Sequence, residues 1–138
     1  MRTQFYRQLT GCFYGLTGEL NVYAATSQEE IRLPALLIGS EWKSLEGAES
    51  NWTFRAETTL TLLTDAETTS AEDADKLERD VIRALQRFSA FDLNERSEDS
   101  IVFYSGFVPD RISEIEADVL GNVPVRKREI AGHYVVQI

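Results

Sequence analysis

Apolar and polar residues alternate most regularly between Trp52 and Thr64. One face of an extended chain would carry Trp52, Phe54, Ala56, Thr58, Leu60 and Leu62, and the other Thr53, Arg55, Glu57, Thr59 and Thr61. A period of two over this length predicts a β-strand with one buried face. The segment is much longer than the usual strand of about 5–6 residues. We therefore expect this strand to project beyond its own domain or to pair with a neighbouring chain.

Two other segments repeat their apolar residues with the period of an α-helix. The first runs from Thr3 to Leu16, and its apolar face comprises Phe5, Leu9, Cys12, Phe13 and Leu16. The second runs from Ala71 to Phe88, and its apolar face comprises Ala74, Leu77, Val81, Ala84, Leu85 and Phe88. Two overlapping capping-box patterns, Thr69–Glu72 and Ser70–Asp73, precede the second helix. Acidic residues fill its first turn and arginines its last, as the helix dipole favours.

Shorter apolar runs predict further strands. Leu20–Tyr23 and Leu33–Gly39 are the first two, with Pro34 at the beginning or the edge of its strand because proline lacks the backbone N–H. The polar, glycine-containing stretch from Ser40 to Ser50 is expected to be a loop. A second polar stretch, Asn94–Ser100, is expected to be a loop as well.

The C-terminal third predicts three or four strands. They are Ile101–Phe107, Ile112–Ala117, Val123–Ile130 and the closing run His133–Ile138, with a turn at Gly121-Asn122 and a break at Pro109-Asp110. Gly132 interrupts the last two runs, and a hairpin or a bulge is expected there. Together the elements predict an α+β fold, a mostly antiparallel sheet with two packed helices, in a single domain over residues 1–138.

Composition excludes several kinds of chemistry. The chain of 138 residues carries 14 Lys and Arg against 23 Asp and Glu, a formal net charge of −9. This charge argues against a general nucleic-acid-binding protein, which needs a basic face. The single cysteine, Cys12, cannot form an intrachain disulfide, and the single histidine, His133, cannot build a multi-histidine metal centre. No apolar run is long enough to span a membrane, and the N-terminus does not resemble a signal peptide. No catalytic residue, metal ligand or cofactor is predicted.

Three features leave alternatives open. Cys12 falls on the apolar face of its helix and is expected to be an inert core residue. His133 is either a pH-sensitive or catalytic group or a partly exposed strand residue. Arg126, Lys127 and Arg128 form a dense basic cluster, and alternation places Arg126 and Arg128 on one face. The cluster would be a solvated face, or contact phosphate or the acidic surface of a neighbouring copy.

The order of elements resembles a family of phage proteins. The resemblance rests on the N-terminal amphipathic helix, "LNVYAA", "IRLPALLIG", the long strand "WTFRAETTLTLLTD", the helix "TTSAEDADKLERDVIRALQRF" and the closing "VRKREIAGHYVVQI". Together they look like the tail terminator and tail completion proteins of long-tailed bacteriophages. The region between Asn94 and Asn122 has no counterpart in the family pattern.

The resemblance implies a structural role in the virion. Such proteins form a ring, usually a homohexamer, that stops tail-tube polymerisation at the head-proximal end of the tube and presents a surface to the neck. The expected partners are therefore copies of the chain, the tail tube protein and a neck or connector protein, while DNA passes through the lumen without specific binding. The protein would be assembled in the host cytoplasm and reside in the virion tail or neck.

A ring needs two different surfaces on each protomer. We expect opposite charge on two sides of the protomer, with Arg126, Lys127 and Arg128 on one side and Glu114, Glu116 and Asp118 on the other. Trp42 and Trp52 flank the predicted loop and are the candidate anchors of an interface. Trp52 is also in phase with the buried face of its strand, which favours core burial instead.

Three other functions remain open from the sequence. The chain would also suit a neck completion protein, a small ligand-binding or adaptor domain, or an enzyme that uses carboxylates or Tyr134 and His133. The copy number of the ring and the face that meets the tube are not predicted.

Overall fold

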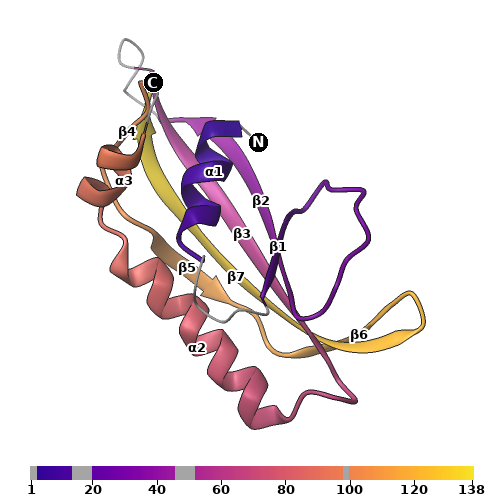
Figure 1. The fold of residues 1–138 in the computed structure, drawn as a ribbon. Coiled ribbons are helices and arrows are strands. Elements are labelled where there is room, and N and C mark those ends of the chain that lie inside the picture. The colour runs from indigo at the N-terminus through magenta and orange to yellow at the C-terminus, as the bar shows by residue number, and fades with distance from the viewer. Residues whose placement is uncertain (1–2, 14–19, 46–51, 98–99) are drawn as a thin grey trace.

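The computed structural model of the chain describes residues 3–13, 20–45, 52–97 and 100–138. Within them lie three helices and one seven-stranded, mostly antiparallel sheet (Figure 1), so the predicted α+β fold is confirmed. The helices are α1 (Thr3–Gly11), α2 (Ala71–Arg87) and α3 (Ala90–Arg96). The strands are β1 (Asn21–Ala24), β2 (Ala35–Ser44), β3 (Thr53–Asp65), β4 (Val102–Phe103), β5 (Val108–Ile112), β6 (Glu116–Leu120) and β7 (Val123–Gln137).

Two long strands, β3 and β7, form the centre of the sheet. They pair with each other in antiparallel register from Thr53↔Gln137 to Asp65↔Val125. β2 pairs antiparallel with the other side of β3, and β1 extends the sheet by a short parallel pairing with β2. The short strands β4, β5 and β6 follow one another along the remaining edge of β7, each antiparallel to it.

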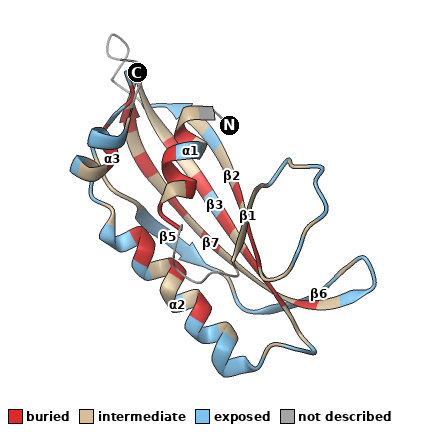
Figure 2. Ribbon diagram, viewed as in Figure 1, coloured by how far each residue is buried: buried red, intermediate tan, exposed pale blue. Residues whose placement is uncertain are grey.

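The main core lies between the helices and one face of the sheet (Figure 2). Because side chains alternate along a strand, the even-numbered residues of β3 and β7 face the helices, and Leu60, Ile130 and Tyr134 are fully buried there. Phe5 of α1 packs its ring against Tyr134 with the centroids 5.5 Å apart. The helices contribute a buried set that comprises Phe5, Leu9, Leu77, Val81, Ala84, Leu85 and Leu93. A small second cluster on the opposite face centres on Ala35, Leu63 and Val125.

The helices begin where the sequence places their caps. The Ser70 hydroxyl accepts a hydrogen bond from the Asp73 amide at the start of α2, which ends one residue before the predicted Phe88. The additional helix α3 begins with a capping box between Ser89 and Asp92. The prediction of a loop from Asn94 to Ser100 is therefore wrong for its first residues, which complete α3. α1 ends at Gly11, earlier than predicted, and Leu16 lies outside the described residues.

Strand boundaries differ from the prediction at several places. β2 continues to Ser44, so the prediction of a loop from Ser40 to Ser50 is wrong for the first half of that segment. Residues 46–50 of the predicted loop lie outside the described part of the chain. β4 retains only two residues of the predicted strand Ile101–Phe107. The predicted strand Ile112–Ala117 is divided, because β5 ends at Ile112 and β6 begins at Glu116.

Gly132 does not interrupt the last strand. β7 continues through it, and the expected hairpin or bulge at this position is wrong. A Cβ on Gly132 would lie 2.2 Å from Cζ of Phe107, so the missing side chain makes room for this ring over the strand. The irregularity lies on the neighbouring strand, where the register of β5 shifts between Pro109 and Arg111.

Candidate assembly surfaces

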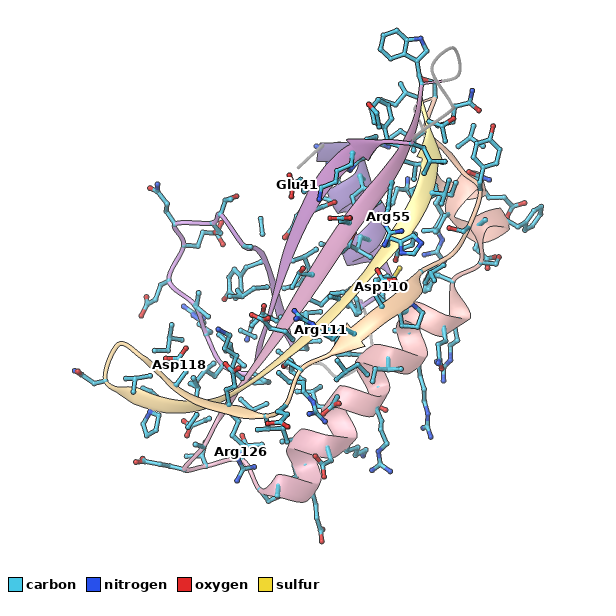
Figure 3. The ribbon with its side chains drawn as sticks, turned by 180° about the vertical axis from the view of Figure 1, so that it is seen from behind. Glu41, Arg55, Asp110, Arg111, Asp118 and Arg126 are labelled. Carbon is cyan, nitrogen blue, oxygen red and sulfur yellow. The ribbon has the colours of Figure 1, made fainter. Side chains whose placement is uncertain are left out.

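The sheet face opposite the helices carries a network of charged side chains (Figure 3). Lys43 Nζ of β2 lies 3.0 Å from Glu57 Oε2 of β3, and Arg55 Nε lies 3.4 Å from Glu57 Oε1. The hydrogen bond from Lys43 to Glu57 raises the pKa of Lys43. The odd-numbered residues of β3 occupy this face, as the alternation predicts. We call these residues, together with Glu41, Asp110, Arg111 and His133, the charged face.

The irregularity in β5 turns Asp110 toward this face. Its Oδ2 lies 3.2 Å from Arg55 Nη2 and 3.0 Å from His133 Nδ1. The hydrogen bond with His133, followed by the nearby charges of His133 and Arg55, lowers the pKa of Asp110. Asp110 thereby links the edge strand to β3 and β7. The sequence shows Asp110 only as part of a pattern break, so its role could not be predicted.

The basic cluster is divided between the two faces of β7. Arg126 and Arg128 face the helices, as the alternation predicts, and lie opposite Thr64 and Leu62 of β3. Arg128 is mostly buried: its Nε donates to Glu78 Oε1 of α2 at 3.0 Å, and its Nη1 donates to the Ser113 carbonyl at 2.7 Å. Arg128 therefore joins α2 to the segment that precedes β6.

Lys127 lies on the opposite face of β7 from these two arginines. Its Nζ is 3.6 Å from Glu129 Oε1.

The acidic residues of the predicted charge pair lie on or next to the strand that neighbours the basic cluster. Glu116 and Asp118 lie on β6, which pairs with β7 so that Glu116 is opposite Lys127 and Asp118 is opposite Val125. The tight turn at Gly121, which has a positive φ of 61°, folds the two segments into one hairpin. Glu114 is exposed just before β6. The turn therefore makes the two clusters neighbours in one hairpin, in which Glu116 and Asp118 share the sheet face of Lys127 and lie on the face opposite Arg126 and Arg128.

The two tryptophans have different surroundings. Trp42 packs against the rings of Phe5 and Phe54, each with a centroid distance of 5.6 Å, and is partly buried at the edge of the core. Trp52 is 69% exposed and has a positive φ of 49°. The expectation of core burial for Trp52 is wrong, because β3 begins only at the next residue. Trp52 stays a predicted interface anchor.

Exposed apolar side chains gather at two parts of the molecule. One group surrounds the end of the sheet that holds the C-terminus, and it comprises Leu45, Trp52, Phe91, Val102, Tyr104 and Ile138. The other follows β5, β6 and the start of β7, and it comprises Val108, Ile112, Ile115, Val119 and Val123. Groups of this kind mark protein–protein contacts more often than isolated exposed residues do.

Other kinds of site have little support in the described part of the chain. No group of three or more His, Cys, Asp and Glu residues there is arranged to hold a metal ion. Burial raises the pKa of the Cys12 thiol to about 12. A depression of about 500 Å³ beside α2 is lined by Asp65, Asp73, Lys76 and Asp80 among other residues. No described helix is both long and apolar enough to cross a membrane.

Comparison with known proteins defines the fold. No protein-family model and no curated protein matches the chain. A chain in the solved structure of the virion of a native gene transfer agent (GTA) particle matches it with a TM-score of 0.65 and 17% sequence identity. The match covers 99% of this chain and 95% of that chain. At this identity the likeness establishes a shared fold over nearly the whole length of both chains.

Proposed function

We propose that the protein is a structural component of a phage-like virion. The observation that carries this proposal is the fold shared over nearly its full length with a chain of a gene transfer agent virion. The match covers 99% of this chain and 95% of that chain, so the shared fold includes nearly all of the residues compared. The likeness of fold alone is an associational argument for function, so the surfaces of the molecule have to support it as well.

Within the virion, the role proposed is that of a tail terminator. The chain would form a ring, a hexamer in the related family, at the head-proximal end of the tail tube and join it to the neck or connector protein. Exposed apolar groups at both the C-terminal end of the sheet and the β6–β7 hairpin suit a protein with partners on two sides. Several charged residues of the sheet pair with one another within the protomer, and no reactive centre is needed for this role.

The net charge of −9 suits a ring through which DNA passes. Like charge on protein and DNA disfavours adhesion of the DNA to the lumen. Arg128 and Lys127 bind carboxylates of their own chain, so much of the basic cluster is already neutralised. A ring with a strongly basic channel would contradict this part of the proposal.

Virions produced without the protein distinguish the candidate roles. For a terminator, electron micrographs should show over-long tails, because tube polymerisation is not stopped. For a neck completion protein, which the same fold and the same two exposed ends also suit, tails of normal length should fail to join heads. Normal, infectious particles in the absence of the protein would refute both roles. The complemented strain serves as the control.

A further inference from the structure

Two opposite edges of the sheet have strand segments with open outer sides. β1 pairs only with Ala35–Ile38 of β2, so within the described residues no strand covers β2 from Gly39 to Ser44. At the other edge, β5 pairs with β7 alone, and all of its residues are exposed. Open edges are places where another chain can dock.

The directions of these two edges suit a repeated contact between copies. Three antiparallel pairings separate β2 from β5, namely β2 with β3, β3 with β7 and β7 with β5, so β2 and β5 run in opposite directions. In a ring whose axis runs along the strands, rotation brings β2 of one copy beside β5 of the next. Their contact is then antiparallel, like the pairings inside the protomer. Because two different edges meet, the contact is head-to-tail and generates a ring.

Each of these edges carries an exposed charge with no ion pair in the described part of the chain: Glu41 on β2 and Arg111 on β5 (Figure 3). Glu41 lies directly opposite Glu57 in the register of β2 and β3. The Glu57 carboxylate is already occupied by Lys43 and Arg55. Like charges opposite each other are destabilising. The charge of Glu41 already acts on nearby Lys43 and helps to raise its pKa, and a cation from outside the protomer would give Glu41 a partner of its own.

Glu41 and Arg111 also lie on the same face of the sheet. Across the sheet, Arg111 of β5 pairs with Ala131 of β7, Ala131 pairs with Thr59 of β3, and Thr59 pairs with Gly39 of β2. Glu41 lies two residues after Gly39 and therefore has its side chain on the same face as Arg111. The two charged side chains therefore lie on the same face of the sheet. Glu41 is displaced along the strands by two residues from the position level with Arg111. Stagger of this kind accompanies the closure of a sheet into a cylinder.

We propose that Glu41 of one copy forms an ion pair with Arg111 of the next copy, and that this contact repeats around the ring. The inference rests on the proposed ring-forming function and identifies its subunit interface. The contact is made by side chains, because Pro109 lacks a backbone N–H and the register shift interrupts β5. On the helix side of the same edges, this register places Ile112, 47% exposed, opposite Ser40 of the neighbour and diagonal to its partly buried Trp42.

Crosslinking tests the proposed proximity. The variant with both Glu41→Cys and Arg111→Cys is treated with a short bifunctional maleimide and separated by denaturing electrophoresis. Within one chain the two positions lie on opposite edges of the sheet, so crosslinking must join different copies. We expect a ladder of covalent multimers up to the full ring. Each single-cysteine variant should give no product larger than a dimer, since Cys12 is buried.

Charge reversal tests the energetic role. Either E41R or R111E alone should move the assembly midpoint in native mass spectrometry to about tenfold higher protein concentration, and the double variant E41R/R111E should restore it. The exposed residues Glu67 and Arg83, which lie on neither edge, provide the matched control E67R/R83E with unchanged assembly. Thermal unfolding confirms that all variants fold.

The outcomes separate this inference from the function on which it rests. If the wild-type protein forms rings but the double-cysteine variant gives no ladder and the reversals assemble normally, the interface lies elsewhere and the ring function stands. If the wild-type protein remains a single chain both alone and with purified tail tubes, the ring function and the interface are both refuted.

Discussion

Replacement of Gly132 by alanine is expected to destabilise the protein through one overpacked contact. An added Cβ would lie 2.2 Å and 2.6 Å from two carbons of the Phe107 ring and 2.5 Å from the Val108 carbonyl oxygen, where ordinary contacts begin at 3.4 Å. The ring has to move by roughly 1 Å or more to restore normal separation. The carbonyl belongs to β5 and can move only if the pairing of β5 with β7 is disturbed.

The magnitude follows from three contributions. Overpacking of a filled site costs about 1–3 kcal/mol. Displacement of the Phe107 ring from Tyr134, where the centroids are 5.5 Å apart, costs about 0.5–1.5 kcal/mol more. The smaller conformational entropy of alanine in the unfolded chain offsets about 0.4–1 kcal/mol. We expect the free energy of unfolding to fall by about 2 kcal/mol.

Urea denaturation followed by tryptophan fluorescence measures this change. Gly39→Ala is the matched control, because its Cβ would meet only the Ala25 Cβ, at an ordinary 3.5 Å, and its stability should equal or slightly exceed that of the wild type. Adding Phe107→Leu to Gly132→Ala should recover only part of the loss, because the contact with the Val108 carbonyl remains. Equal stability of Gly132→Ala and Gly39→Ala would refute the reasoning.

Three further predictions concern charged and reactive side chains. Arg128→Ala should lower the free energy of unfolding in urea by about 1–3 kcal/mol, because it leaves the mostly buried Glu78 without its cation; a change within experimental error would contradict this. The pKa of Asp110 is lowered in the folded state. The Asp110 carboxylate should therefore add to the free energy of unfolding above about pH 4, and this contribution should vanish as the pH falls through the folded-state pKa. The stability difference between wild type and Asp110→Asn, measured from pH 2 to 7, should therefore shrink at the acid end, and a difference that grows there would be inconsistent with the ion pairs. The Cys12 thiol should be unreactive toward an aromatic disulfide reagent at pH 8 in the folded protein and react on unfolding, since it is buried with a raised pKa of about 12; rapid reaction of the native protein would contradict its burial in the core.

The regular elements could be predicted from the sequence because local signals and tertiary packing agree there. The helix from Ala71 was predicted to within one residue of its end, since its caps and its apolar face both mark it. The strand from Thr53 to Asp65 was predicted equally well, because it lies between two partners and buries every second residue on one face.

The edges of the fold could not be predicted in the same way. β2 continues through polar residues because β3 supplies partners for its backbone as far as Ser44, which hydrophobic periodicity does not record. β5 is exposed at every residue and so has no apolar pattern. Gly132 within β7 makes room for the ring of Phe107, which is distant in sequence.

The candidate surfaces were predicted only in part. The basic cluster and the tryptophans stood out by composition, but the turn at Gly121 brings the acidic and basic clusters together. Asp110, Glu41 and Arg111 gained their importance only from strand register, which brings together residues that are far apart in the chain.

Cryo-electron microscopy of purified virions tests the central claim most directly. The account predicts density for this fold, repeated as a closed ring, between the end of the tail tube and the neck, with the β2 edge of each copy against the β5 edge of the next. Absence of the chain from purified virions by mass spectrometry, or its density at any position other than this junction, would contradict the account.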